Sequence, residues 1–231
     1  MKKLFISALA LAAFTACSQE EIVDNQQLSA AISFDGVFVE NATRVADPST
    51  TTDNIAAFDV WGYVKNSDGV VFDDVTVNKK DGEWTYEPYP LQYWIPGNDY
   101  RFFALSPSKT GSVVKAGSND PFADGLGQIT YTNNNGTEDL LYASVSRENV
   151  KSAEENVKFI FDHLLSKVKF TFLNGFTTGK NTISVTNVKM VVPQTASIDL
   201  NEQGNYAWTG HEGTVTLEFD DMSDGTAIDE K

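Results

Sequence analysis

Apolar and polar residues alternate with a period of two in short segments from residue 31 onward. In the first such segment, residues 31–39, Ile32, Phe34 and Phe38 share one parity and Val37 lies on the other. Alternation of this kind, rich in β-branched and aromatic residues, is typical of a half-buried strand. The chain shows no helical period in its apolar residues. The pattern therefore predicts an all-β protein.

One later segment is apolar on both parities. Phe58, Val60 and Val64 lie on one parity, and Trp61 and Tyr63 lie on the other. A strand with two apolar faces is expected at the centre of a sheet, covered on both sides. Turns are predicted at residues 67–69, 81–82 and 96–98, and a long loop at residues 106–128. Further strands are predicted at residues 70–77, 84–86, 89–95, 100–105, 129–132, 139–145, 195–200, 206–208 and 214–219.

Two long segments change parity partway along. In residues 157–173, Phe159 and Phe161 are followed on the opposite parity by Val168, Phe170 and Phe172. A slip of one residue would turn the apolar face outward, so a turn or bulge is expected within residues 162–167. Residues 183–192 change parity in the same way at residues 186–187. Strands that bend at corners favour a Greek-key-like β-sandwich of the transthyretin or immunoglobulin type.

The first 16 residues form a predicted signal peptide. Two lysines precede an apolar run over residues 4–14, which is too short for the ~20 residues that span a bilayer as a helix. The junction FTAC resembles a bacterial lipobox, which implies cleavage between Ala16 and Cys17 and acylation of Cys17. The alternative is an ordinary secretory peptide with an incidental cysteine. Cys17 is the only cysteine, so the chain has no internal disulfide and its body has no catalytic thiol.

The charge of the chain restricts its partners. Removal of residues 1–16 takes away two lysines and no acids, which leaves 15 basic and 32 acidic residues and a net charge of −17. Such a chain is not expected to bind nucleic acid or to dock electrostatically on anionic lipid. Residues 17–30 are predicted to be an acidic tether. Ser18-Gln19-Glu20-Glu21 also looks like a signal that sends lipoproteins to the outer face of the Gram-negative outer membrane.

Enzymatic signatures are weak. His163 and His211 have no cysteine partner and no zinc or Ser-His spacing, so no catalytic residue, metal ligand or cofactor is predicted beyond the lipid on Cys17. Residues 220–225 superficially resemble a calcium loop, but Met222 and Lys231 stand where oxygen ligands are needed. We expect a solvated turn there.

Three blocks of sequence carry a family resemblance. YPLQYWIPGNDYRFFALSP, EDLLYASV and VKFIFDHLLSKVKFTF follow one another behind the lipobox and an early Thr43-Arg44. In this order they resemble the fimbrillin family of outer-surface pilus subunits, over roughly residues 31–192. Residues 31–193 are then expected to form the N-terminal sandwich. Because fimbrillins usually have two such domains, residues 194–231 are either additional strands or the start of a truncated second domain.

The resemblance implies assembly by donor-strand exchange. An Arg-specific protease would cut after Arg44, the strand with Ile32, Phe34, Val37 and Phe38 would leave, and a strand of another pilin subunit would take its place. The partners expected are other subunits, of the same or an accessory kind, and adhesive ligands on host or neighbouring cells. The protein would be an outer-membrane lipoprotein before processing and part of a fimbria afterwards. Shaft, tip and anchor roles stay open.

Two other functions fit the same leader. A non-polymerising anchor lipoprotein would keep Arg44 uncut. A glycan-binding surface lipoprotein would use flat rings that stack on sugars, for which the chain offers Trp61, Tyr63, Trp84, Tyr86, Tyr93 and Trp94. Buried rings would argue for the pilus subunit, and exposed coplanar rings for the glycan binder.

Overall fold

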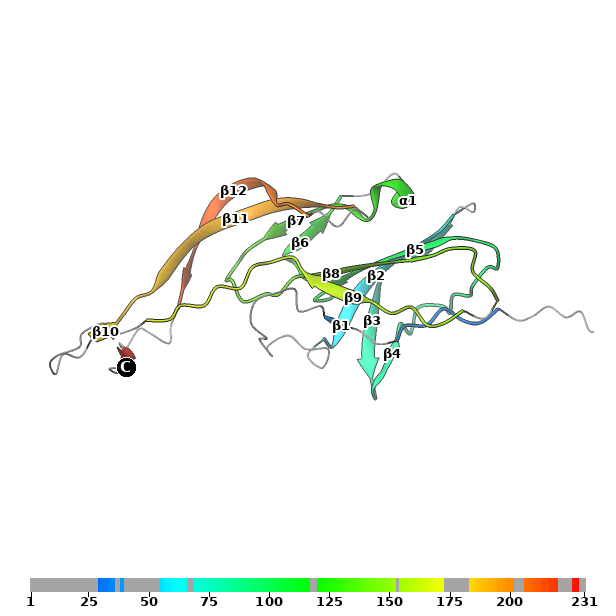
Figure 1. Cartoon of the computed structure of the whole chain (residues 1–231), viewed down its shortest axis with the longest axis horizontal. Coiled ribbons are helices and arrows are strands. Elements are labelled where there is room, and N and C mark those ends of the chain that lie inside the picture. The colour runs from blue at the N-terminus through cyan, green and yellow to red at the C-terminus, as the bar shows by residue number, and fades with distance from the viewer. Residues whose placement is uncertain are drawn as a thin grey trace, which may run out of the picture.

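The structure is a computed structural model that describes residues 29–35, 38–39, 55–65, 69–116, 120–152, 154–172, 183–201, 206–219 and 226–228. Almost all of its regular structure is β (Figure 1). The prediction of an all-β sandwich is confirmed by two main sheets that share a core. The lipidation site Cys17, the cleavage residue Ala16, Arg44 and Val37 lie outside the described residues.

The larger sheet has seven strands. In spatial order they are β1 (Phe38–Val39), β9 (Ile160–His163), β8 (Leu141–Arg147), β5 (Tyr100–Ser106), β2 (Ala57–Val64), β3 (Gly69–Lys80) and β4 (Glu83–Thr85). All neighbours are antiparallel except β1, which is parallel to β9. The β3–β4 turn occurs at the predicted Asp81-Gly82, where both residues have positive φ, 54° and 89°. Two consecutive positive φ angles match the right-handed twist of a tight hairpin.

The smaller sheet has four strands, β12 (Thr209–Glu218), β11 (Lys189–Leu200), β7 (Gly127–Thr132) and β6 (Val113–Lys115). A separate pair joins β10 (Ile183–Val185) and β13 (Thr226–Ile228), and the short helix α1 (Pro121–Asp124) lies between β6 and β7 in the chain. β11 pairs with β12 over residues 189–197 and with β7 over residues 195–200, so that residues 189–194 pair with β12 alone. β11 thus crosses residue 193, where we expected one domain to give way to further strands; the division into domains stays a prediction.

Two cores lie on opposite faces of the large sheet. The second core lies between the sheets, where Trp61 and Phe103 of the large sheet meet Ile129, Ile198 and Leu200 of the small one. The first core, on the other face, is larger and includes Phe58, Val60 and Val64 of β2. The two parities of β2 therefore face two cores, as predicted for a central strand. β2 is also tightly packed at Gly62, where an added Cβ would lie 2.7 Å from Cδ2 of Phe72.

Four predicted elements are wrong in detail, among them the strand expected at residues 206–208, which are in no strand and lie just before β12. Residues 89–95 form an irregular segment with one β-bridge, at Tyr93, because an earlier segment of the chain pairs there for only a few residues. The expected loop at residues 106–128 contains β6 and α1, since Asp120 caps a helical turn through its side chain. Residues 168–172 are in no strand, and Val168, Phe170 and Phe172 are 47%, 36% and 36% exposed. Among the described residues, no strand pairs with this alternating segment.

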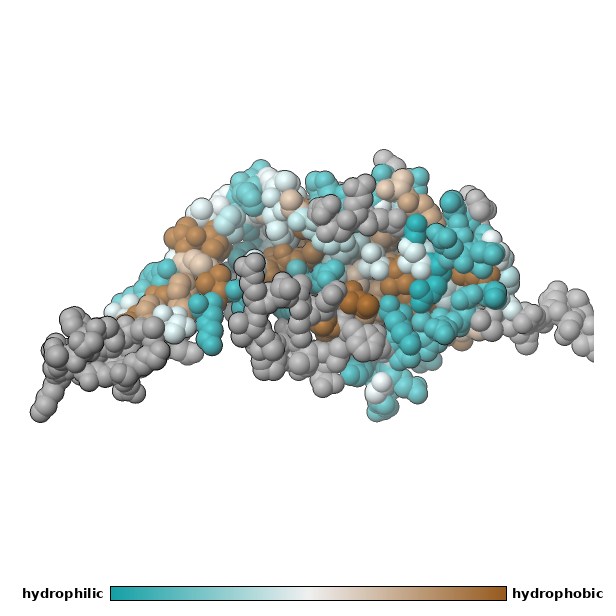
Figure 2. All heavy atoms as spheres, in the orientation of Figure 1, coloured by the Kyte–Doolittle hydropathy of each residue, from teal (hydrophilic) through white to brown (hydrophobic). Residues whose placement is uncertain are grey.

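The chain breaks its strand at both predicted places, but only the second break, between β10 and β11, is followed by another strand. Phe159 and Phe161 are buried on one face before β9 ends at His163, within the residues expected to turn. β10 and β11 are separated at residues 186–188, where Asn187 has a φ of 53°. Beyond its pairing with β7, β11 and its partner β12 extend past β6, β7 and the large sheet as a long two-stranded arm (Figure 1). Hydrophobic residues follow this extension on its surface (Figure 2).

Candidate functional site: the strand site of the N-terminal segment

The N-terminal segment, residues 29–35 and 38–39, runs between two other parts of the chain. On one side Ala31 forms an antiparallel bridge with Tyr93, and on the other Phe34 forms a parallel bridge with Val157. β1 continues the parallel pairing, Phe38 with Ile160. The predicted first strand is therefore present as an extended, paired segment, with its regular ladder reduced to residues 38–39. We call its surroundings, residues 92–94, 152 and 157–161 with the core beneath them, the strand site.

Backbone hydrogen bonds hold both edges of this segment. On the first side, the Ile32 amide donates to Gln92 O at 2.7 Å and the Trp94 amide donates to Ala30 O at 3.1 Å. On the second side, the Val157 amide donates to Ser33 O at 2.8 Å and the Asp35 amide donates to Val157 O at 3.0 Å. Residues 30–35 are thus bonded on both sides like an inner strand, whereas β1 is the edge strand beside β9. Removal of residues 30–35 would leave donors and acceptors unpaired on both neighbours.

Two side chains of the segment enter the first core. Ile32 is 1% exposed and Phe34 is 4% exposed. The Phe34 ring stacks on Phe159, with centroids 5.8 Å apart, and meets Phe58, Phe72 and Tyr86 at 6.1, 5.5 and 5.9 Å. Burying one such ring contributes several kcal/mol, of the order of the ~3–5 kcal/mol that Phe→Ala costs in cores. The predicted core side of the segment is therefore correct for Ile32 and Phe34; Phe38 is placed only through the backbone of β1.

Tyr86 links the floor of the strand site to the backbone of the segment. Its hydroxyl donates to Ile32 O at 2.8 Å and accepts from the Gln92 amide at 3.3 Å. Burial raises the pKa of Tyr86 above its usual value, partly offset by the bond from Gln92. The phenol therefore stays neutral and keeps its proton for the carbonyl. Sequence reasoning missed this role, and the only signal was the density of aromatic residues between residues 84 and 94.

The polar side of the segment faces water. Ser33 Oγ donates to Asn156 Oδ1 at 2.5 Å, and Ala31 and Tyr93 form a pair that points away from the core. Of the six rings considered for sugar stacking, Trp61, Tyr86 and Trp94 are buried and Trp84 and Tyr63 are half-buried. Tyr93 alone of the six is exposed, at 53%. The arrangement suits a core and a strand site far better than a sugar platform.

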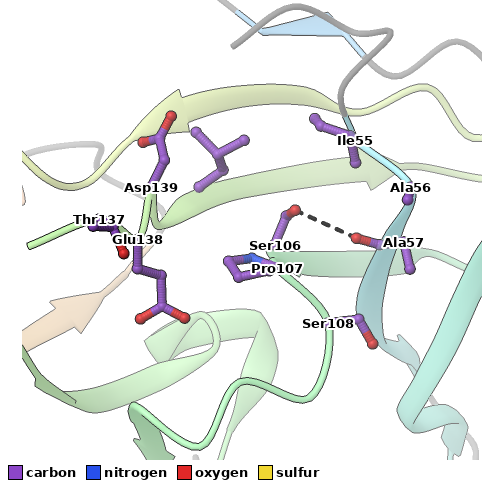
Figure 3. Close-up of a pocket in the computed structure, with 10 residues that line it drawn as sticks. Ile55, Ala56, Ala57, Ser106, Pro107, Ser108, Thr137, Glu138 and Asp139 are labelled. Carbon is purple, nitrogen blue, oxygen red and sulfur yellow. Dashed lines mark hydrogen bonds between the residues drawn. The ribbon is translucent and has the colours of Figure 1, made fainter. Parts of the chain in front are cut away.

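A second concave feature lies at the start of β2. It has a volume of about 460 Å³ and is lined by Ile55, Ala56, Ala57, Ser106, Pro107, Ser108, Thr137, Glu138, Asp139 and Leu141 (Figure 3). Its polar groups already have partners in the protein. Asp139 Oδ1 lies 2.8 Å from His163 Nδ1, the Thr110 hydroxyl donates to Glu138, and Ser106 Oγ donates to Ala57 O at 3.3 Å. These bonds explain its carboxylates as structural.

Neither a metal centre nor a membrane helix occurs in the described part of the chain. Within those residues, no group of three or more His, Cys, Asp or Glu side chains could hold a metal ion. No helix among them has the length and apolar character needed to cross a bilayer. His163 is at the end of β9, paired with Asp139, and His211 lies in β12. The strand site is therefore the feature from which we infer a function.

The fold and the strand site together define a class of protein, an all-β sandwich completed by a strand from its own N-terminal region. A model of the fimbrillin-like family matches residues 43–228, and the chain belongs to that family. The predicted resemblance is thus confirmed. Fimbrillin-like proteins are structural proteins of pili rather than enzymes, and membership implies a pilus subunit that assembles with other pilins in cell-surface fimbriae. A search of curated proteins finds no match.

Proposed function

We propose that this chain is exported as a lipoprotein, held at the outer membrane by a lipid on Cys17, and assembled by strand exchange after cleavage at Arg44. The observation that supports this most directly is that the N-terminal segment contributes Ile32 and Phe34 to the first core and that its residues 30–35 are hydrogen-bonded along both edges. Its removal would expose an apolar floor and two rows of backbone groups. A strand of another subunit would satisfy both.

The position of the arginines supports cleavage at Arg44. The chain has three arginines, and the other two, Arg101 and Arg147, lie in β5 and β8. Both of these strands are paired within the large sheet. A protease binds its substrate as an extended, unpaired chain, so arginines within paired strands are protected while the sheet persists. Cleavage on the carboxyl side of Arg44 would release the whole of the N-terminal segment.

The lipid anchor would act before cleavage. Several acyl chains on Cys17 would each bury many methylenes at ~0.8 kcal/mol apiece, which is enough for lasting membrane attachment. Cleavage at Arg44 would separate that anchor from residues 45–231. The lipid would thus hold the precursor at the membrane, and the mature subunit would be held by its neighbours instead.

The test compares three variants in cells. Cys17→Ala is expected to abolish lipid labelling and membrane retention of the precursor. Arg44→Ala is expected to block polymer ladders after mild heating, whereas the control Arg147→Ala should assemble normally. The native chain should begin at a free Val45. A blocked, acylated Cys17 on assembled protein, or normal ladders from Arg44→Ala, would contradict the proposal and favour an anchor lipoprotein.

A further inference from the structure

We propose that the strand site selects its occupant by a residue pattern: an aromatic side chain must lie two positions after the residue whose carbonyl accepts from the Tyr86 hydroxyl. The inference rests on the proposed strand exchange, and it names the chemistry of the partner. The partner is an extended segment of another pilin subunit with an apolar residue, a small polar residue and an aromatic residue in succession, as in Ile32-Ser33-Phe34.

The aromatic requirement comes from the shape around Phe34. Rings lie on several sides of it: Phe159 is nearly parallel, at 16°, and Phe58 and Tyr86 present their edges at 89° and 79°. Such face and edge contacts are available to a flat ring and unavailable to a branched aliphatic chain. A leucine in this position would leave space beside Phe159 and lose the edge contacts.

The register requirement comes from Tyr86. This residue is 6% exposed, and its hydroxyl donates to a backbone carbonyl, that of Ile32, rather than to a side chain. A strand shifted by one residue would turn its apolar side chains to solvent. A strand shifted by two would keep the parity and could still offer a backbone carbonyl to the Tyr86 hydroxyl. Its aromatic side chain, however, would miss the ring pocket, by which we mean the space that Phe34 occupies among Phe58, Phe72, Tyr86 and Phe159. Tyr86 and the ring pocket together therefore define one register.

The residues between these anchors tolerate polar groups. Ser33 lies between Ile32 and Phe34 in sequence, and its hydroxyl bonds Asn156 at the surface. The neighbouring Glu154 and Glu155 are acidic and close in sequence to this edge, so a small neutral residue at the middle position avoids charge repulsion. From its N-terminal end, the pattern is thus an apolar residue, a small polar residue and an aromatic residue. The strand that carries it runs parallel to residues 157–161.

The register is tested in the intact chain by disulfide formation. Ala31 and Tyr93 are a pair that is not directly hydrogen-bonded, because the flanking bonds join residues 32 with 92 and 94 with 30. Such pairs lie close enough for a disulfide. In a Cys17→Ala background, Tyr93→Cys is combined with Ser29→Cys, Ala31→Cys or Ser33→Cys. Only the pair 31/93 should cross-link in air.

Tyr86→Phe combined with Phe34→Leu should then permit cross-links from residue 29 or 33 as well, because neither the carbonyl nor the aromatic ring any longer fixes the register. Tyr89→Phe is the matched control, since the Tyr89 hydroxyl bonds Val71 O at 3.3 Å and does not contact the N-terminal segment. It should behave as the parent. Cross-linking restricted to 31/93 in the Tyr86→Phe, Phe34→Leu double variant would overturn the register role.

Aromatic selection is tested by hydrogen exchange at the Ile32 and Asp35 amides of the intact chain. Phe34→Leu should raise their exchange roughly tenfold, and Phe34→Tyr or Phe34→Trp should raise it less, since they keep a ring. Phe170→Leu serves as a control, because Phe170 is 36% exposed. Equal exchange in Phe34→Leu and the parent would overturn the aromatic requirement.

A separate measurement tests the proposed function itself. Subunits cleaved at Arg44 are mixed with a labelled peptide of residues 29–40, and with its Phe34→Leu form. Entry of the first peptide and roughly tenfold weaker binding of the second support both ideas. If neither peptide enters, strand exchange is wrong, while the cross-linking and exchange results still decide the selection pattern.

Discussion

The N-terminal segment and residues 168–172 carry almost the same pattern and lie in opposite environments. Both alternate apolar and polar residues and both place a phenylalanine at the third position of the pattern, Ile32-Ser33-Phe34 and Val168-Lys169-Phe170. Ile32 and Phe34 are buried, whereas Val168 and Phe170 are 47% and 36% exposed. The difference arises from what lies beside each segment: backbone on two edges for the first, and no strand partner among described residues for the second.

The alternation of apolar and polar residues predicts the apolar face of a segment but not its partner. A period of two specifies that one face of a segment is apolar, but not which surface will cover that face. Phe34 is covered by four aromatic rings from distant parts of the chain. Phe170 contacts Phe172 and Phe219, with centroids 6.3 and 5.1 Å away, and remains partly in water. Two segments with nearly the same pattern of side chains therefore contribute unequally to stability.

The largest expected effect is the loss of the buried ring. Phe34→Ala should lower the free energy of unfolding by about 3–5 kcal/mol, because it leaves a cavity among the core rings. Phe170→Ala, the same change in the exposed segment, should cost less than about 1 kcal/mol. Urea denaturation followed by tryptophan fluorescence measures both. Similar losses for the two variants would show that the segments are equally buried in solution.

The two halves of β11 extend the comparison within one strand. Ile198 is 1% exposed and faces the second core, whereas Val191, in the half paired only with β12, is 65% exposed. Ile198→Ala should destabilise by about 2–5 kcal/mol and Val191→Ala by no more than about 0.5 kcal/mol. Thermal unfolding of the two variants should rank them clearly. A large effect of Val191→Ala would show that this part of β11, which pairs with β12 alone, is covered by another surface in solution.

The smallest effect is a dependence on alkaline pH. Tyr131 lies in the second core at 5% exposure, and burial, with Glu138 beside it, raises its pKa from 10.0 to about 12. The folded state therefore holds this proton more tightly than the unfolded chain. Its contribution to stability is complete below pH 10 and is lost as the pH rises from 10 to about 12. Tyr131→Phe should reduce the loss of the urea midpoint between pH 9 and pH 11; an unchanged loss would assign it to other groups.

Much of the fold follows from local sequence. The central position of β2 was predictable because both its parities are apolar, and the β3–β4 turn because Asp-Gly accepts positive φ. The side of the N-terminal segment that is buried was predictable from Ile32 and Phe34. In each case the decisive information lies within a few consecutive residues.

The partners of these elements could not be predicted in the same way. Nothing local indicates that Phe34 lies beside Val157, or that Tyr86 donates to Ile32 O, because these contacts join residues far apart in the sequence. Residues 89–95 looked like a strand because they are aromatic, yet the rings of Tyr89 and Trp94 pack against other segments in the first core, and Tyr93 is exposed. The residues that form the strand site are thus brought together by long-range contacts, which the pattern of a single sequence does not predict.

The parallel direction of β1 along β9 has a further consequence for a polymer built by strand exchange. A strand that repeats these hydrogen bonds can enter the site in one direction only, and the entering surface differs from the receiving one. Such a contact is heterologous, so it does not close on a pair of subunits and leads to an open, directional fibre. Its two ends would be chemically different. A subunit that retained its own N-terminal segment would receive no neighbour and would terminate growth at that end.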